Sequence, residues 1–170
     1  VISLRPDRIA LYNYAHLPSL RPHQKIMDKF VRPDSEERLT IFTEGYTEFL
    51  KNGYRSIGMD HFALETDELF LALERGTLYR NFMGYTVKRG AGMIGVGASA
   101  IGEVGGSYFQ NIREAKSYEE SVADHGIAAF RGCLLSSDDE QRKWIILELM
   151  CKFVLSFDEY QARFGSDFRI

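Results

Sequence analysis

The spacing of hydrophobic residues over the first 76 positions switches repeatedly between two periods. Residues 7–14 and 54–62 carry short runs of β-branched and aromatic residues, which predict strands. Residues 35–52 have apolar side chains at intervals of three, four and seven, which predicts a helix, and a second helical pattern ends near Gly76. This strand–helix–strand–helix order predicts an α/β fold with a parallel sheet or barrel.

Capping residues support both helices. Asp34 is followed three residues later by Glu37, the spacing of a capping box, and Gly53 fits the stop of the same helix. Thr66 can cap the second helix, with Asp67 in its first turn, where a negative charge is favourable.

The composition changes over residues 84–106, where eight of the fifteen glycines lie. Within this segment, residues 93–101 are apolar or small and predict a buried strand or an extended turn. Residues 111–125 predict a helix that stops at Gly126, and residues 127–135 predict a short strand.

The last strong helical pattern begins at Asp138 or Asp139, either of which can act as its cap. It is apolar over so much of its circumference that we expect burial from more than one side. The chain ends soon afterwards with no obvious packing partner for this helix. Its apolar residues are Trp144, Ile145, Ile146, Leu147, Leu149, Met150, Cys151 and Val154.

Composition excludes several classes of protein. Hydrophobic residues make up 45% and charged residues 26%, which are globular values. The net charge of −3 without a basic block argues against general nucleic-acid binding. No apolar run approaches the roughly 18 residues of a membrane span, and the N-terminus is not a signal peptide. We therefore expect a cytoplasmic protein with no membrane partner.

The two cysteines, Cys133 and Cys151, limit the possible metal chemistry. They cannot form a Cys₃ or Cys₄ site, and the sequence has neither a C-x₂-C nor an H-x₃-H pair. We expect two reduced thiols and no metal site in this chain.

The glycine-rich segment contains a literal G-x-G-x-x-G at Gly90, Gly92 and Gly95. As a dinucleotide fingerprint it is weak, because a poor strand precedes it and no capped helix follows. The alternative is that glycine lets the backbone approach another group closely.

Two histidines lie at the ends of predicted strands. His16 follows the first strand, and the Asp60-His61 pair closes the second. In α/β barrels, polar residues at the carboxyl ends of strands are catalytic candidates, whereas the structural alternative is a histidine that hydrogen-bonds the next turn.

Several motifs together resemble one family. They lie at residues 5–18 (RPDRIALYNYAHLP), 53–63 (GYRSIGMDHFA), 79–86 (YRNFMGYT), 95–101 (GVGASAI) and 108–111 (YFQN). In this order and spacing the chain resembles the oxygen-independent coproporphyrinogen III oxidases, which are radical S-adenosylmethionine enzymes. The resemblance covers essentially the whole chain but less than half of the family protein.

The resemblance implies an α/β fold consisting of the second half of a partial (βα)6 radical-SAM barrel, followed by the start of a mostly helical C-terminal domain. Residues 1–135 would belong to the barrel with its glycine-rich extension, and residues 136–170 would begin the C-terminal domain. Because the chain also lacks a starting Met, we expect an excised or processed fragment.

The implied reaction is oxidative decarboxylation of two propionates of coproporphyrinogen III to vinyl groups. The full-length enzyme uses S-adenosylmethionine and a 4Fe–4S cluster. By position, Ala15 and Ile101 would contact S-adenosylmethionine, with Phe82 and Met83 beside them. The family usually has Gln where this chain has Met83, so an amide hydrogen bond is lost. Asp60 and His61 match the family motif, but no chemical role follows for them.

The family binds its cluster through a C-x-x-x-C-x-x-C motif that this sequence lacks. We therefore expect the fragment alone to hold no cluster and to be inactive, and an uncovered half-barrel to self-associate, most simply as a dimer. Two alternatives stay open. One is a radical-SAM-like haem chaperone, and the other is a dinucleotide-binding domain.

Overall fold

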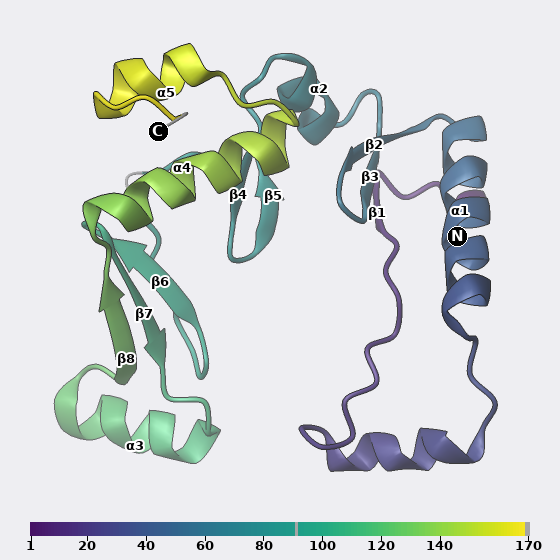
Figure 1. Ribbon diagram of the computed structural model, residues 1–170. Helices are drawn as coiled ribbons and strands as arrows, with labels where there is room; N and C mark the ends of the chain where they lie inside the picture. Colours follow the sequence, from purple (N-terminus) through teal and green to yellow (C-terminus); the bar gives the residue numbers. More distant parts are fainter. Residues whose placement is uncertain (91, 169–170) are drawn as a thin grey trace. The chain divides into compact units, whose positions relative to one another are not determined.

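The computed structural model describes residues 1–90 and 92–168. The chain divides into two compact units, Val1–Arg75 and Gly76–Ile170 (Figure 1). Both units mix helices with small sheets, so the predicted α/β class is confirmed. The predicted domain boundary between residues 135 and 136 stays a prediction.

The first unit has a three-stranded sheet in the order β1-β3-β2. Both pairings are antiparallel. The parallel arrangement predicted from the alternating pattern is therefore wrong for the described strands of this unit. Its elements are η1 (Ile2–Leu4), β1 (Arg8–Ala10), η2 (Pro22–Lys29), α1 (Ser35–Lys51), β2 (Tyr54–Gly58), β3 (His61–Leu64) and α2 (Glu68–Glu74).

One turn, between β2 and β3, explains why the sheet is antiparallel and not parallel. Residues 54–62 were expected to form a single strand, but the chain reverses after Gly58, and β2 and β3 form a hairpin. Gly58 has φ 156° and Met59 has φ 50°, so two successive residues leave the extended conformation. β1 is also shorter than expected, because only three of its residues pair with β3.

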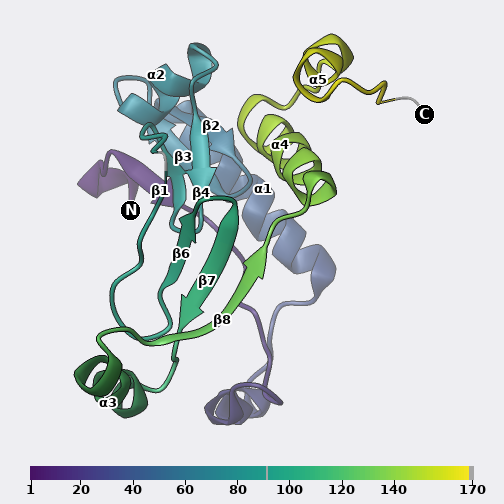
Figure 2. The ribbon, with the colours of Figure 1, turned by 90° about the vertical axis from the view of Figure 1, so that its left-hand side faces the viewer.

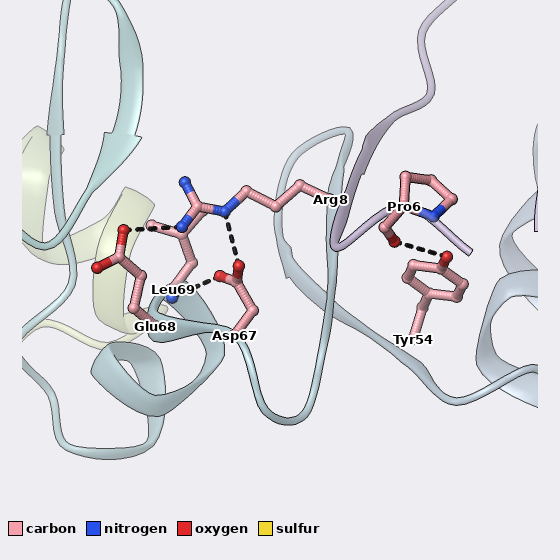
Figure 3. Close-up of polar contacts among 6 residues, drawn as sticks. All are labelled: Pro6, Arg8, Tyr54, Asp67, Glu68 and Leu69. Carbon is pink, nitrogen blue, oxygen red and sulfur yellow. Dashed lines mark hydrogen bonds and ion pairs between the residues drawn. The ribbon is translucent and has the colours of Figure 1, made fainter. Parts of the chain in front are cut away.

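An aromatic cluster forms the core of this unit. Phe49, Tyr54 and Phe62 are buried, and the Phe49 and Phe62 rings meet edge to face with centroids 5.1 Å apart. The hydroxyl of Tyr54 donates a hydrogen bond of 2.7 Å to the carbonyl oxygen of Pro6 (Figure 3). A buried tyrosine thus satisfies its polar end while its ring packs in the core.

Both helices of the first unit are capped by aspartate. The predicted capping box of Asp34 and Glu37 is confirmed, and Gly53 takes a positive φ after the helix end. For α2 the predicted cap Thr66 is wrong, since Asp67 Oδ1 accepts a 2.7 Å bond from the Leu69 amide. A carboxylate accepts helix N–H groups at least as well as a hydroxyl.

The second unit has a β4–β5 hairpin and a three-stranded antiparallel sheet, β6-β7-β8, with β7 in the middle (Figure 2). The parallel prediction is wrong for these described strands as well. The elements are β4 (Tyr79–Asn81), β5 (Gly84–Thr86), β6 (Ile101–Val104), β7 (Ser107–Asn111), α3 (Ala115–His125), β8 (Ala129–Leu134), α4 (Ser137–Lys152) and α5 (Phe157–Phe164).

Several predictions for this unit are confirmed. The helix ending at Gly126 corresponds to α3, and the short strand corresponds to β8. Residues 93–101 do not form a buried strand, because Met93 pairs only in an isolated bridge with Glu103 and the next strand, β6, begins at Ile101. The glycines and small residues of that segment offer little side-chain surface for a strand to bury.

The cap of the last long helix, α4, lies two or three residues before the predicted Asp138 or Asp139. Ser136 is the N-cap, and Asp139 completes a capping box from the third helical position, so neither Asp138 nor Asp139 is the cap. Trp144 does have downstream packing partners, which corrects the earlier expectation. Its ring centroid lies 5.9 Å from that of Tyr160 and 5.8 Å from that of Phe164. Burial from more than one side is incomplete within this unit, because Ile146 is 54% exposed.

Candidate functional site

Ala15 lies in the first unit, in the segment that leaves β1. Its side chain is exposed, but its backbone is fixed by one side chain. Gln24 Nε2 donates to the Ala15 carbonyl at 3.1 Å, and Gln24 Oε1 accepts from the Leu17 amide at 2.7 Å. A small side chain on a held backbone leaves room for a ligand without a mobile loop.

His16 beside it is held from both ring nitrogens. Its Nε2 lies 2.8 Å from Asp28 Oδ1, and its Nδ1 lies 3.4 Å from the Tyr14 hydroxyl. His16 lines a cavity of about 710 Å³ together with exposed apolar side chains such as Phe30 and Val31. These contacts fix the orientation of the imidazole. A fixed imidazole is compatible with a structural role and with a role in ligand binding.

Asp60 lies in the turn between β2 and β3, and His61 is the first residue of β3. His61 Nδ1 lies 2.7 Å from Asp60 Oδ1, and the Asp60 carbonyl accepts a 2.8 Å bond from the Leu11 amide. The pair therefore joins β1 to the hairpin. No chemical role for either side chain follows from these contacts.

Phe82 and Met83 form the turn between β4 and β5 in the second unit. Asn81 Oδ1 accepts a 2.8 Å bond from the Met83 amide, which fixes the turn. The Phe82 ring meets the Tyr108 ring edge to face, with centroids 5.2 Å apart, whereas the Met83 side chain is 88% exposed. Both side chains are thus presented on a rigid hairpin tip and are open to a ligand.

Ile101 begins β6 directly after the glycine-rich segment, and that segment is held by side chains. Asn111, which is buried, donates from Nδ2 to the carbonyl oxygens of Gly95 at 3.2 Å and Gly97 at 3.0 Å. The Tyr118 hydroxyl accepts a 3.1 Å bond from the Gly97 amide. An irregular loop is made rigid because its peptide groups have fixed partners.

Gly95 is required by this packing. A Cβ there would lie 2.6 Å from the Ile101 carbonyl oxygen, a distance that real Cβ atoms do not adopt. A strand, β6, follows the described part of the segment, whereas a dinucleotide fingerprint opens a helix. Residue 91, within the motif at Gly90 to Gly95, lies outside the described residues. The glycines here serve close backbone packing, as the alternative interpretation predicted.

The second unit contains a pocket that the sequence did not reveal. It has a volume of about 430 Å³ and lies between the β4–β5 hairpin, the β6–β7 strands and α4. Lys143 forms an ion pair with Glu103 and lies 5.4 Å from the centre of the Tyr108 ring. No sequence motif marks these residues, because they come from elements up to 40 positions apart.

The pocket changes the titration of two groups. Burial raises the pKa of Tyr108, and the negative charge of Glu103 acts in the same direction. Burial acts to lower the pKa of Lys143, but its hydrogen bond to Glu103 and nearby negative charge outweigh this, so the pKa is raised. Both groups therefore keep their protons near neutral pH.

Residues 1–90 and 92–168 contain no group of three or more His, Cys, Asp or Glu side chains that could hold a metal ion or an iron–sulfur cluster. Cys133 is exposed and Cys151 is buried, and both are free thiols. Burial raises the pKa of the Cys151 thiol. Residues 1–90 and 92–168 therefore do not offer the ligands of a 4Fe–4S cluster.

Comparisons with known proteins agree with the resemblance that the motifs indicated. No family model matches the chain. The chain is 41% identical over 169 residues to the oxygen-independent coproporphyrinogen III oxidase of Pseudomonas aeruginosa, covering 99% of this chain and 37% of that protein. It is 42% identical over 169 residues to the enzyme of the same name from Thermostichus vulcanus, covering 98% of this chain and 52% of that protein.

A solved structure agrees. The coproporphyrinogen III oxidase (HemN) of Escherichia coli, described as a radical SAM enzyme, matches with a TM-score of 0.90 and 38% identity over 97% of this chain and 38% of that one. The resemblance predicted from the motifs is confirmed. The chain spans about 37% of the length of the first curated relatives it matches.

The four residues assigned by that resemblance are distributed over both units. Phe82 and Met83 share one turn and Ile101 begins β6, all in the second unit, whereas Ala15 belongs to the first. Their contact with a ligand stays a prediction. Among the described helices, none is long and apolar enough to cross a membrane.

Proposed function

We propose that this chain supplies one segment of an oxygen-independent coproporphyrinogen III oxidase, which converts two propionates of coproporphyrinogen III to vinyl groups. The observation that carries the proposal is the agreement with the Escherichia coli structure over 97% of the chain at 38% identity. The names of the curated relatives support the oxidase over a haem chaperone.

Ala15, Phe82, Met83 and Ile101 are the residues proposed to hold S-adenosylmethionine. When bound, S-adenosylmethionine with a reduced cluster would supply the radical that abstracts hydrogen from a propionate. The residues of this chain would bind S-adenosylmethionine and shield it from water. Ala15 leaves space above a backbone fixed by Gln24, and Phe82 and Ile101 offer apolar surface that keeps water away from a reactive species.

The cluster ligands are proposed to come from outside this chain, since the described residues do not provide them. Incubation of the chain with iron and sulfide under anaerobic conditions tests this. We expect less than a stoichiometric amount of bound iron and no activity, and a stoichiometric cluster on the chain would overturn this part of the proposal.

A segment-swap chimera tests the function. The matching segment of the Escherichia coli oxidase is replaced by this chain, the cluster is reconstituted, and conversion of coproporphyrinogen III is followed by chromatography. We expect product. A chimera that holds both cofactors yet forms no vinyl product would overturn the proposal, and saturable transfer of haem from it would favour the chaperone.

Ala15→Trp in the chimera tests the S-adenosylmethionine contact, with Ala162→Trp on α5 as the matched control, since both alanines are exposed. We expect weaker S-adenosylmethionine binding for the first variant only. Equal binding by the two variants would contradict the assignment of Ala15.

The chain alone is also proposed to self-associate as a dimer and to act in the cytoplasm. All six residues of the outer strand β8 are exposed, including Phe130 and Leu134, and an open strand edge favours pairing with another chain. The free state of Cys133 and Cys151 is compatible with a reducing compartment. Sedimentation of a compact monomer would contradict the dimer.

A further inference from the structure

Arg80 carries a buried side-chain donor that has no partner in the described part of the second unit. It lies at the centre of β4, opposite Tyr85 of β5, and its Nε is buried without a hydrogen-bond partner. Its guanidinium carbon lies 5.7 Å from the centre of the Tyr85 ring. Within residues 1–90 and 92–168, the Arg80 side chain has neither an ion pair nor a hydrogen bond.

The position of Arg80 is fixed by its neighbours. The Tyr85 ring is buried, and its hydroxyl donates a 2.9 Å bond to the Met150 carbonyl of α4. The guanidinium is thus held against an anchored aromatic face and cannot turn freely to solvent. A buried donor without an acceptor lowers stability, which makes such an arginine costly unless a ligand supplies the acceptor.

The other cations around the same pocket already have partners. Lys143 pairs with Glu103, and Arg142 Nε lies 2.6 Å from Asp138 Oδ2. The second carboxylate of the lining, Asp139, is engaged with Ser136 in the capping box of α4. Neither carboxylate of the lining is therefore paired with Arg80, and a carboxylate of a ligand would supply the missing acceptor.

The remaining walls are apolar or aromatic. They include Phe82, which is half exposed at the hairpin tip, and a row of α4 side chains. The volume of about 430 Å³ lies within the range of small-ligand pockets. The full apolar and aromatic lining is Tyr79, Phe82, Tyr108, Leu135, Ile146, Leu147 and Met150.

We propose that this pocket binds one carboxylate of a ligand that also carries an apolar ring system, with Arg80 as its recognition residue. The proposal rests on the proposed function, and the ligand group is then a propionate side chain of the porphyrinogen. The planar guanidinium matches a carboxylate, and the apolar walls accept part of the adjoining ring system.

Titration of the 170-residue chain with coproporphyrin III, the stable oxidised form of the substrate, tests this. The single tryptophan, Trp144, lies on α4 next to the pocket residue Lys143, so energy transfer from it to the porphyrin reports binding. We expect saturable binding that Arg80→Gln weakens about 10- to 100-fold. Arg80→Lys keeps the charge but loses the planar guanidinium, and we expect its porphyrin affinity to lie between those of the unmodified chain and Arg80→Gln.

Two matched controls locate the effect. Arg113→Gln removes an exposed charge outside the pocket, and Arg142→Gln removes a pocket charge that already has a partner. We expect changes of less than about threefold for both. Circular dichroism and the thermal midpoint show whether each variant folds. The tetramethyl ester of coproporphyrin, in the same dilute detergent, is expected to bind at least tenfold more weakly.

Equal affinities of Arg80→Gln and Arg113→Gln would overturn the proposal, as would equal binding of acid and ester, or failure of the unmodified chain to bind. None of these results bears on the chimera assay. An active chimera with an Arg80-independent porphyrin affinity would leave the oxidase function standing and remove only the carboxylate pocket.

Discussion

Two arginines on short strands of the two units differ in what surrounds them. Arg8 of β1 donates from Nε to Asp67 at 2.9 Å and from a terminal nitrogen to Glu68 at 2.8 Å (Figure 3). The Arg80 side chain of β4 forms no ion pair with a carboxylate of the described residues. The first arginine joins a strand to a helix N-terminus, whereas the second presents an unused donor to a pocket.

Neighbouring charges explain the difference. Asp67 caps α2 and Glu68 lies in its first turn, so the helix supplies two carboxylates opposite β1. The hydrogen bonds to Asp67 and Glu68 raise the pKa of Arg8. In the pocket that Arg80 lines, Glu103 is already paired with Lys143, and Asp139 is engaged with Ser136 at the start of α4. An arginine satisfied by its own chain is structural, and one left unsatisfied indicates a ligand.

The two units also use aromatic rings differently, and removing one ring from each sharpens the comparison most strongly. Phe62→Ala takes a fully buried ring from the core of the first unit, which we expect to destabilise it by about 3–5 kcal/mol. Phe82→Ala removes a half-exposed ring, with an expected loss below about 1.5 kcal/mol. Urea unfolding measures both, and equal losses would contradict the distinction between a core ring and a site ring.

Asn111→Ala tests how the glycine-rich segment is held. The change leaves the carbonyls of Gly95 and Gly97 without their buried donor, so we expect a loss of about 1–3 kcal/mol. Hydrogen exchange should accelerate at the Ser99 amide, which bonds Ile112 beside the loop. Unchanged exchange in a folded variant would show that the loop is rigid without Asn111.

Glutamine at each arginine tests the comparison directly. Arg8→Gln is expected to lower stability by about 0.2–1 kcal/mol, since its pairs are partly exposed to solvent. Arg80→Gln removes a buried donor without a partner and is expected to leave stability unchanged or slightly higher. A larger loss at Arg80 than at Arg8, by thermal unfolding, would show that Arg80 is structural.

The smallest expected effect concerns Tyr108. Its pKa is raised in the folded state, so the protonated phenol contributes stability below its unfolded pKa of about 10, and that contribution is lost as pH rises through the folded value. Glu103→Gln removes a nearby negative charge and is expected to lower the pKa of Tyr108. Absorbance near 295 nm during an alkaline titration measures this, and an upward shift would contradict it.

Local patterns predicted local structure well. Asp34 with Glu37, Gly53 and Gly126 marked helix ends that the structure confirms. The prediction failed where two residues decide the direction of the chain. Gly58 and Met59 lie within a pattern that predicts one continuous strand. Their positive φ values instead turn the chain into a hairpin and make the sheet antiparallel.

The candidate site divides in the same way. The motifs in the sequence identified the family resemblance and the positions Ala15, Phe82, Met83 and Ile101, because each lies within a contiguous motif. The pairing of Lys143 with Glu103 and the isolation of Arg80 depend on which elements pack together. Charges far apart in the chain interact only after folding has brought them within a few ångströms. Linear spacing therefore determined the main helices, the caps of α1 and α3 and the family resemblance, whereas only the tertiary structure decided which arginine has a partner.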